Sequence, residues 1–142
     1  MLRGPEGVAA VALRELAGLR RERVIVLVCD GANRLRYVVT VAEGSSDRSP
    51  FPVRAILQAV LRHDGKAFAV AHNHPSGDPT PSEADVEATR AIVEAARSVR
   101  VRFLEHVVVG SRDWRPALAI AHEGAVHDRG SKRSTDNLPM PR

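Results

Sequence analysis

The chain alternates between strand-like and helix-like patterns of hydrophobic positions. Runs of β-branched residues predict strands, and apolar residues that recur every three or four positions predict amphipathic helices. The predicted helices cover residues 5–20, 53–62 and 82–98. The predicted strands cover residues 23–29, 35–42, 66–72, 105–110 and 114–121. In chain order these elements read αββαβαββ, which indicates an α+β domain in which helices and sheet share one core.

Turn residues separate the predicted elements. The sequence DGAN at residues 30–33 favours a tight connection, so the first two strands are expected to form a hairpin. The loop NHPSGDPTP at residues 73–81 carries three prolines and leads into the third helix. Residues 127–142 lack the apolar side chains that would order them, and we expect a disordered tail there.

Composition narrows the class of protein. A chain of 142 residues with 44% hydrophobic and 27% charged residues is typical of one soluble globular domain. No run of 18 apolar residues is present, and Glu6 and Glu15 interrupt the N-terminal segment, unlike a signal peptide. Cys29 is the only cysteine, which excludes an intrachain disulfide and a multi-cysteine metal site. We therefore expect a cytoplasmic protein with no membrane partner and a buried Cys29 thiol.

The positive charge gives a weak indication of nucleic-acid binding. The net charge is +4 and the sequence pI is about 10.2. Residues 127–142 hold four basic and two acidic side chains, so this segment alone supplies +2 of the total. Charge gathered at a terminus is usually a solvated tail, and the rest of the chain is nearly balanced.

A cluster of candidate metal ligands lies where the third strand ends. His72 and His74 are two residues apart, so on a strand they project to the same face about 6.8 Å apart. Catalytic zinc sites use three protein ligands, and Asp85, in the first turn of the next helix, can supply the third. Ser82 and Asp85 also match a helix capping box, and a carboxylate that binds a metal has little capacity left for capping.

The spacing of these residues resembles a known motif. His-x-His, seven residues, Ser82, two residues and Asp85 match the JAMM motif of the JAB1/MPN metalloprotease domain. The segment HNHPSGDPTPSEAD is similar to the RadC branch of that family, as are LRRERVIVLVCDGANRL, Arg54 and EHVVVG. The resemblance implies an MPN/JAB-type, cytidine-deaminase-like mixed β-sheet flanked by helices. The domain would span residues 18–126, after an N-terminal helix at 1–17 and before a disordered basic tail at 127–142.

The resemblance also implies a reaction. It assigns a zinc ion to His72, His74 and Asp85, with water as the fourth ligand, and makes the protein a metallopeptidase or isopeptidase acting on a protein or peptide substrate. Ser82 would donate to the oxyanion formed on the amide carbonyl, and Glu22, just before the first strand, would take the proton of the water.

Three further residues and two other functions remain open at this stage. Glu43 and Glu105 are the alternative general bases, and His106 is either a hydrogen-bond partner of a metal-bound imidazole or a histidine at a strand edge. A non-catalytic, partner-binding MPN module is the first alternative function. The second is a DNA-repair-associated factor that binds nucleic acid through the tail and the arginines of RRER at residues 20–23.

Overall fold

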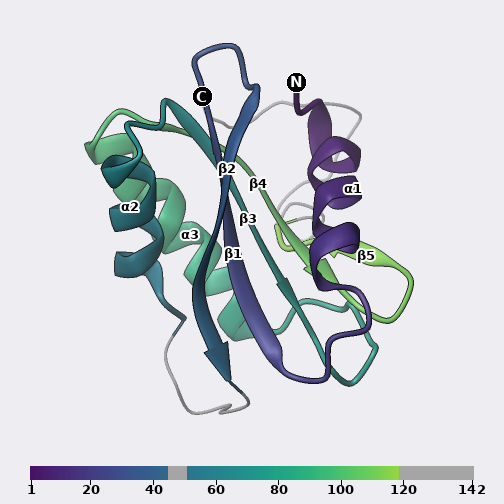
Figure 1. The fold of residues 1–142 in the computed structure, drawn as a ribbon. Helices are drawn as coiled ribbons and strands as arrows, with labels where there is room; N and C mark the ends of the chain where they lie inside the picture. Colours follow the sequence, from purple (N-terminus) through teal and green to yellow (C-terminus); the bar gives the residue numbers. More distant parts are fainter. Residues whose placement is uncertain (45–50, 119–142) are drawn as a thin grey trace, which may run out of the picture.

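In the part of the chain that the structure describes, three helices and five strands follow one another in the predicted order. The computed structural model describes residues 1–44 and 51–118 of the chain. The elements are α1 (Gly4–Leu16), β1 (Glu22–Cys29), β2 (Leu35–Gly44), α2 (Val53–Arg62), β3 (Ala67–Asn73), α3 (Glu83–Ser98), β4 (Arg102–Val109) and β5 (Trp114–Pro116). The order αββαβαββ is therefore confirmed (Figure 1).

The strands form one mixed sheet in the order β2-β1-β3-β4-β5. β1 is antiparallel to both β2 and β3, β3 is parallel to β4, and β4 is antiparallel to β5. Helix α1 covers one face of the sheet, while α2 and α3 cover the other (Figure 1). This arrangement confirms the predicted α+β fold of the MPN/JAB type.

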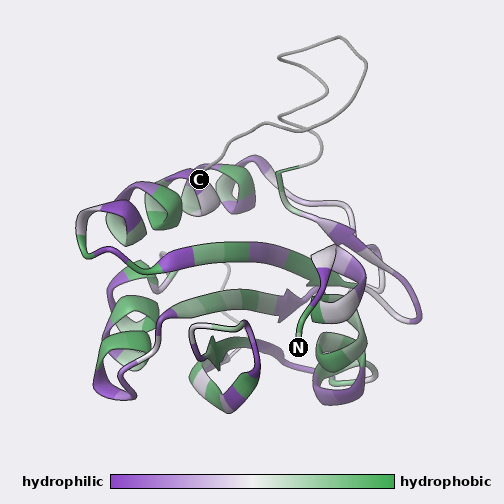
Figure 2. Cartoon of the chain, turned by 90° about the horizontal axis from the view of Figure 1, so that it is seen from above, coloured by the Kyte–Doolittle hydropathy of each residue, from purple (hydrophilic) through white to green (hydrophobic). Residues whose placement is uncertain are grey.

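Small aliphatic side chains build a core on each face of the sheet. Because side chains alternate along a strand, Ile25 and Leu27 of β1 pack towards α1, and Val24 and Val26 pack towards α2 and α3. All seven residues of β3 are buried, and so is the Cys29 thiol at the end of β1, as predicted. In Figure 2 the helices carry both hydrophobic and hydrophilic positions, as expected for helices with one buried face.

Several element boundaries differ from the prediction. Helix α1 ends at Leu16 instead of residue 20, because Ala17 is extended and Gly18 has a φ of +83°, which breaks the helical pattern. Strand β4 begins at Arg102 instead of residue 105, because its first residues gain partners in β3 through parallel pairing. The last strand, predicted over 114–121, ends at Pro116, and residues 117–118 form a turn. The rest of that predicted strand, at 119–121, and the predicted tail at 127–142 lie outside the described residues.

None of the helices within the described residues has the length and apolar character needed to cross a bilayer.

Candidate metal centre

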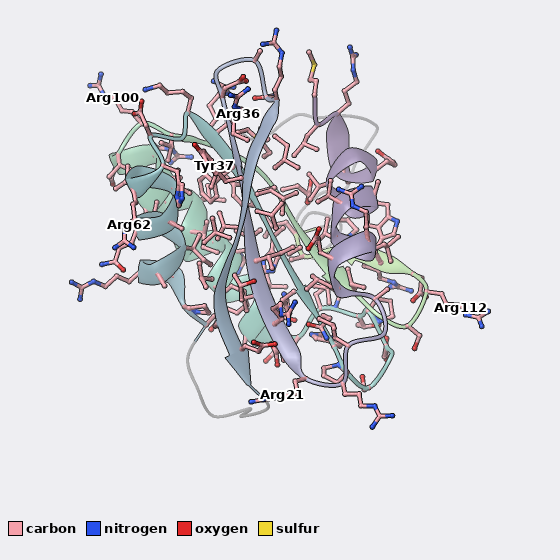
Figure 3. The ribbon with its side chains drawn as sticks, viewed as in Figure 1. Arg21, Arg36, Tyr37, Arg62, Arg100 and Arg112 are labelled. Atoms are coloured by element: carbon pink, nitrogen blue, oxygen red, sulfur yellow. The ribbon has the colours of Figure 1, made fainter. Side chains whose placement is uncertain are left out.

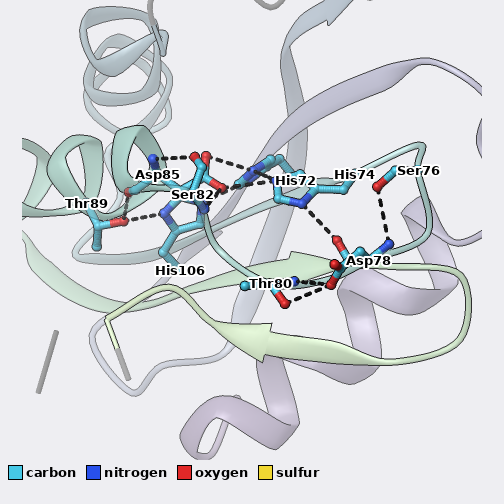
Figure 4. Close-up of polar contacts among 9 residues, drawn as sticks. All are labelled: His72, His74, Ser76, Asp78, Thr80, Ser82, Asp85, Thr89 and His106. Carbon is cyan, nitrogen blue, oxygen red and sulfur yellow. Dashed lines mark hydrogen bonds and ion pairs between the residues drawn. The ribbon is translucent and has the colours of Figure 1, made fainter. Parts of the chain in front are cut away.

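The two histidines of the motif meet at the end of the central strand β3. His72 is fully buried and shares the face of Val70, which packs towards α2 and α3. His74 follows the strand, and its backbone N–H donates to the carbonyl of Val109 over 2.8 Å, which holds the loop against the end of β4. The Nε2 atoms of the two imidazoles lie 3.3 Å apart (Figure 4).

Asp85 completes the cluster from the first turn of α3. Its Oδ1 lies 3.2 Å from Nε2 of His72, and its Oδ2 lies 3.0 Å from Nε2 of His74. Tetrahedral zinc with ligands at about 2.0–2.1 Å separates those ligand atoms by about 3.3 Å. The donor atoms have the chemistry of metal ligands and all lie within 4.8 Å of one another, so the three side chains form a group that can hold a metal ion.

The electrostatics of the cluster favour a positive charge between its members. Burial raises the pKa of the Asp85 carboxyl, but hydrogen bonds with His72 and His74 outweigh burial and hold that pKa well below its usual range. The hydrogen bond with Asp85 raises the pKa of His74 despite its partial burial. A carboxylate that stays ionised beside two imidazole nitrogens is a suitable environment for a divalent cation.

The capping box and the metal-ligand cluster occur together. Ser82 Oγ accepts from the N–H of Asp85, and Asp85 Oδ2 accepts from the N–H of Ser82, both over 3.0 Å. The predicted capping box is therefore confirmed. The cap uses only Oδ2, while Oδ1 faces His72. The Ser82 oxygen is an acceptor in this cap, so its own hydroxyl proton remains available for donation.

His106 lies behind His72. Its Nε2 is 2.9 Å from Nδ1 of His72, and it is fully buried on β4, between β3 and β5. The alternative that His106 lies at a strand edge is therefore wrong. The alternative that His106 is a hydrogen-bond partner of His72 is confirmed. Burial holds the pKa of His106 well below its usual range, so its imidazole is neutral. The Phe51 ring packs 5.2 Å from both imidazoles and contributes to this apolar environment.

The role of Thr89 was not predicted from the sequence. Its Oγ1 lies 2.6 Å from Nδ1 of His106 and donates to the backbone carbonyl of Asp85 over 2.7 Å (Figure 4). Thr89 is fully buried, four residues after Asp85 on α3, and this helical spacing places the two residues on one face. Thr89 could have been identified from the sequence as a polar residue four positions after a candidate metal ligand on a predicted helix.

The three candidate glutamates have different environments. Val24 pairs with His72 across β1 and β3, and Glu22, two residues earlier, therefore lies on the face of His72. The Glu22 carboxylate contributes to the raised pKa of His74, which places its charge near the cluster. The Glu43 carboxylate instead forms a salt bridge of 2.6 Å with Arg23.

Glu105 lies on the opposite face of the sheet. It pairs with Ala69, whose side chain packs in the core under α1. Burial raises the pKa of Glu105 to about 7, and the nearby charge of Glu6 on α1 adds to this increase. The sheet itself therefore separates the Glu105 carboxyl from His72 and Asp85.

Asn73, between the two histidines, holds the start of β1 in place. Its Oδ1 accepts from the N–H of Arg23 over 2.7 Å, and its Nδ2 donates to the carbonyl of Arg21 over 3.0 Å. These two hydrogen bonds fix the position of the backbone on both sides of Glu22. This role was not predicted from the sequence, although a polar residue at the end of a buried, largely apolar strand is a recognisable signal.

Comparison with known proteins agrees with this geometry. The family model described as RadC-like JAB domain matches residues 2–124. A UPF0758 protein of Pelobacter propionicus is 38% identical over 100 residues, which cover 70% of this chain and 44% of the relative. A UPF0758 protein of Syntrophotalea carbinolica is 36% identical over 122 residues, which cover 86% and 52%, respectively. The chain thus spans about half the length of the curated relatives it matches. The extent of the family match shows that the chain belongs to the RadC-like JAB domain family.

Proposed function

We propose that this protein is a zinc-dependent hydrolase that cleaves amide or isopeptide bonds in protein or peptide substrates. The observation that carries the proposal is the convergence of His72, His74 and Asp85, whose ligand atoms all lie within 4.8 Å of one another. Membership in the RadC-like JAB domain family supports it. When bound, zinc supplies Lewis acidity that polarises a carbonyl group and makes water nucleophilic near neutral pH.

The residues around the cluster have separate roles in this proposal. The Glu22 carboxylate takes a proton from the attacking water and returns it to the leaving amine. Its place on the face of His72, held by the bonds of Asn73 to the flanking backbone, supports this role. The Ser82 hydroxyl donates to the carbonyl oxygen as negative charge develops there, and its fixed position as the cap of α3 orients that donor.

The complete ligand set favours a hydrolase over the two alternative functions. A partner-binding module does not need His72, His74 and Asp85 at metal-ligand distances. A nucleic-acid surface needs clustered positive charge, whereas Arg21, Arg62, Arg100 and Arg112 project outwards at separate places around the molecule (Figure 3). The proposal includes a cytoplasmic location, which the buried free thiol of Cys29 supports.

Metal analysis of the full chain tests the proposal. Protein purified without added metal or chelator should hold about one zinc ion per chain, the number that one three-ligand site binds. Both His74→Ala and Asp85→Ala should lose the metal, whereas Glu22→Gln should retain it because Glu22 is not a ligand. A wild type without zinc that also fails to take it up on titration would refute the zinc site.

Cleavage of a library of internally quenched peptides and isopeptide-linked peptides tests the reaction. The Glu22→Gln variant should lose about 100-fold or more of the wild-type rate, the usual contribution of a general base. Equal rates would refute the role of Glu22. A protein that holds zinc but cleaves neither kind of substrate would favour the partner-binding module.

A further inference from the structure

We propose that Thr89 and His106 are positioning residues that hold His72 in the tautomer with its proton on Nδ1, which leaves Nε2 free to bind a metal. The inference rests on the proposed function in taking zinc as that metal. It concerns a chain of hydrogen bonds that runs from the backbone of α3, through β4, to the end of β3 (Figure 4). The direction of each bond follows from the one before it.

The series of hydrogen bonds starts at the backbone carbonyl of Asp85, which can accept a hydrogen bond but cannot donate one. Thr89 Oγ1 lies 2.7 Å from the backbone carbonyl oxygen of Asp85, and two oxygens at that distance need a hydrogen between them. The hydroxyl proton of Thr89 is therefore directed to this carbonyl. Towards Nδ1 of His106, 2.6 Å away, the same oxygen can only accept, so Nδ1 of His106 carries a proton.

The proton on Nδ1 of His106 in turn determines which nitrogen of His72 donates. A neutral imidazole has one ring proton, and His106 is fully buried without a carboxylate among its hydrogen-bond partners. Its Nε2 is therefore an acceptor, and Nδ1 of His72, 2.9 Å away, is the donor. In the neutral ring of His72 the lone pair then lies on Nε2, 3.2 Å from Oδ1 of Asp85, and a second proton on Nε2, shared with Asp85 in the absence of metal, is the one that a metal displaces.

The opposite tautomers of His72 and His106 would be unfavourable at both ends of this series of hydrogen bonds. They would put the His72 proton on Nε2, inside the cluster where a metal must bind. They would also leave the oxygens of Thr89 and Asp85 in contact at 2.7 Å with no hydrogen between them. His74 needs no such chain, because its Nδ1 donates directly to the backbone carbonyl of Asp78 over 2.9 Å.

Asp85 thus acts on the metal centre twice. Its carboxylate belongs to the ligand cluster, and its backbone carbonyl fixes the proton of Thr89. Because both groups belong to the first turn of α3, the same helix start that places one ligand also sets the tautomer of another. Hydrogen-bond partners of metal-bound imidazoles commonly contribute 10- to 100-fold to metal affinity.

Nuclear magnetic resonance of the zinc-free wild type tests the tautomer directly. Long-range proton–nitrogen correlations of the imidazole rings distinguish a proton on Nδ1 from one on Nε2. We expect both His72 and His106 to carry the proton on Nδ1. A His72 ring with no proton on Nδ1 would overturn the inference. This measurement uses no zinc, so its outcome is independent of whether the proposed function is correct.

Zinc affinity of two Thr89 variants tests the effect on the metal. In competition with a chromophoric chelator, Thr89→Val should bind zinc about 10- to 100-fold more weakly, because the buried N–H of His106 loses its acceptor. Thr89→Ser keeps the hydroxyl and should bind as tightly as the wild type. Wild-type affinity in Thr89→Val, or equal weakening in Thr89→Ser, would overturn the inference. A wild type that binds no zinc would instead refute the proposed function.

Discussion

Replacing Asn73 with alanine should destabilise the fold through the loss of two long-range hydrogen bonds. Asn73 is 2% exposed, and it joins the end of β3 to the start of β1 over 2.7 Å and 3.0 Å. A buried hydrogen bond contributes about 0.5–1.5 kcal/mol to stability, so losing both should lower the free energy of unfolding by about 2 kcal/mol. Because these bonds flank Glu22, the variant should also hydrolyse substrate more slowly while it retains the metal ligands.

Urea denaturation of zinc-free protein measures the stability change without a contribution from metal binding. With a slope of about 2 kcal/mol/M, a loss of about 2 kcal/mol shifts the unfolding midpoint by about 1 M. Ser98→Ala is the matched control, because it removes an exposed hydroxyl whose one hydrogen bond, to Glu94, is 3.4 Å long. A midpoint for Asn73→Ala no lower than that of the control would refute the assignment of these bonds as a structural clamp.

Three further predictions concern the cap, the loop and the half-buried carboxyl of Glu105. Ser82→Ala should cost about 1 kcal/mol in urea denaturation of zinc-free protein, and Ser82→Asn, which also caps helices, should recover most of it. Gly110→Ala should cost about 2 kcal/mol and weaken zinc binding, because its Cβ would meet the Gly77 carbonyl and lie 2.9 Å from Cδ of Pro79, in the loop that follows His74. Burial raises the pKa of Glu105 from 4.5 to about 7, so its protonated form stabilises the fold below pH 4.5 and this contribution is lost as the pH rises through 7. Glu105→Gln should therefore unfold at a higher urea concentration than the wild type at pH 8 but not at pH 4, and an equal difference at both values would contradict the burial of this carboxyl.

The sequence by itself determined the local structure. The apolar spacing of residues 53–62 matches α2 at both ends, and the Ser82-x-x-Asp85 pattern marks the start of α3. Both depend on interactions within a few residues of each other, which are side-chain periodicity and capping. The candidate ligands His72, His74 and Asp85 could be found for the same reason, because a strand end, a loop and a helix start within 14 residues bring them together.

Only the tertiary structure decided what surrounds those ligands. His106 reaches His72 because β3 and β4 pair in parallel, and the start of β1 reaches Asn73 because β1 pairs with β3. The hydrogen bonds that result join residues 34 and 50 positions apart. Local periodicity shows which positions are buried but not which strands are neighbours, and strand pairing alone places Glu105 across the sheet from the cluster and Glu22 on its face.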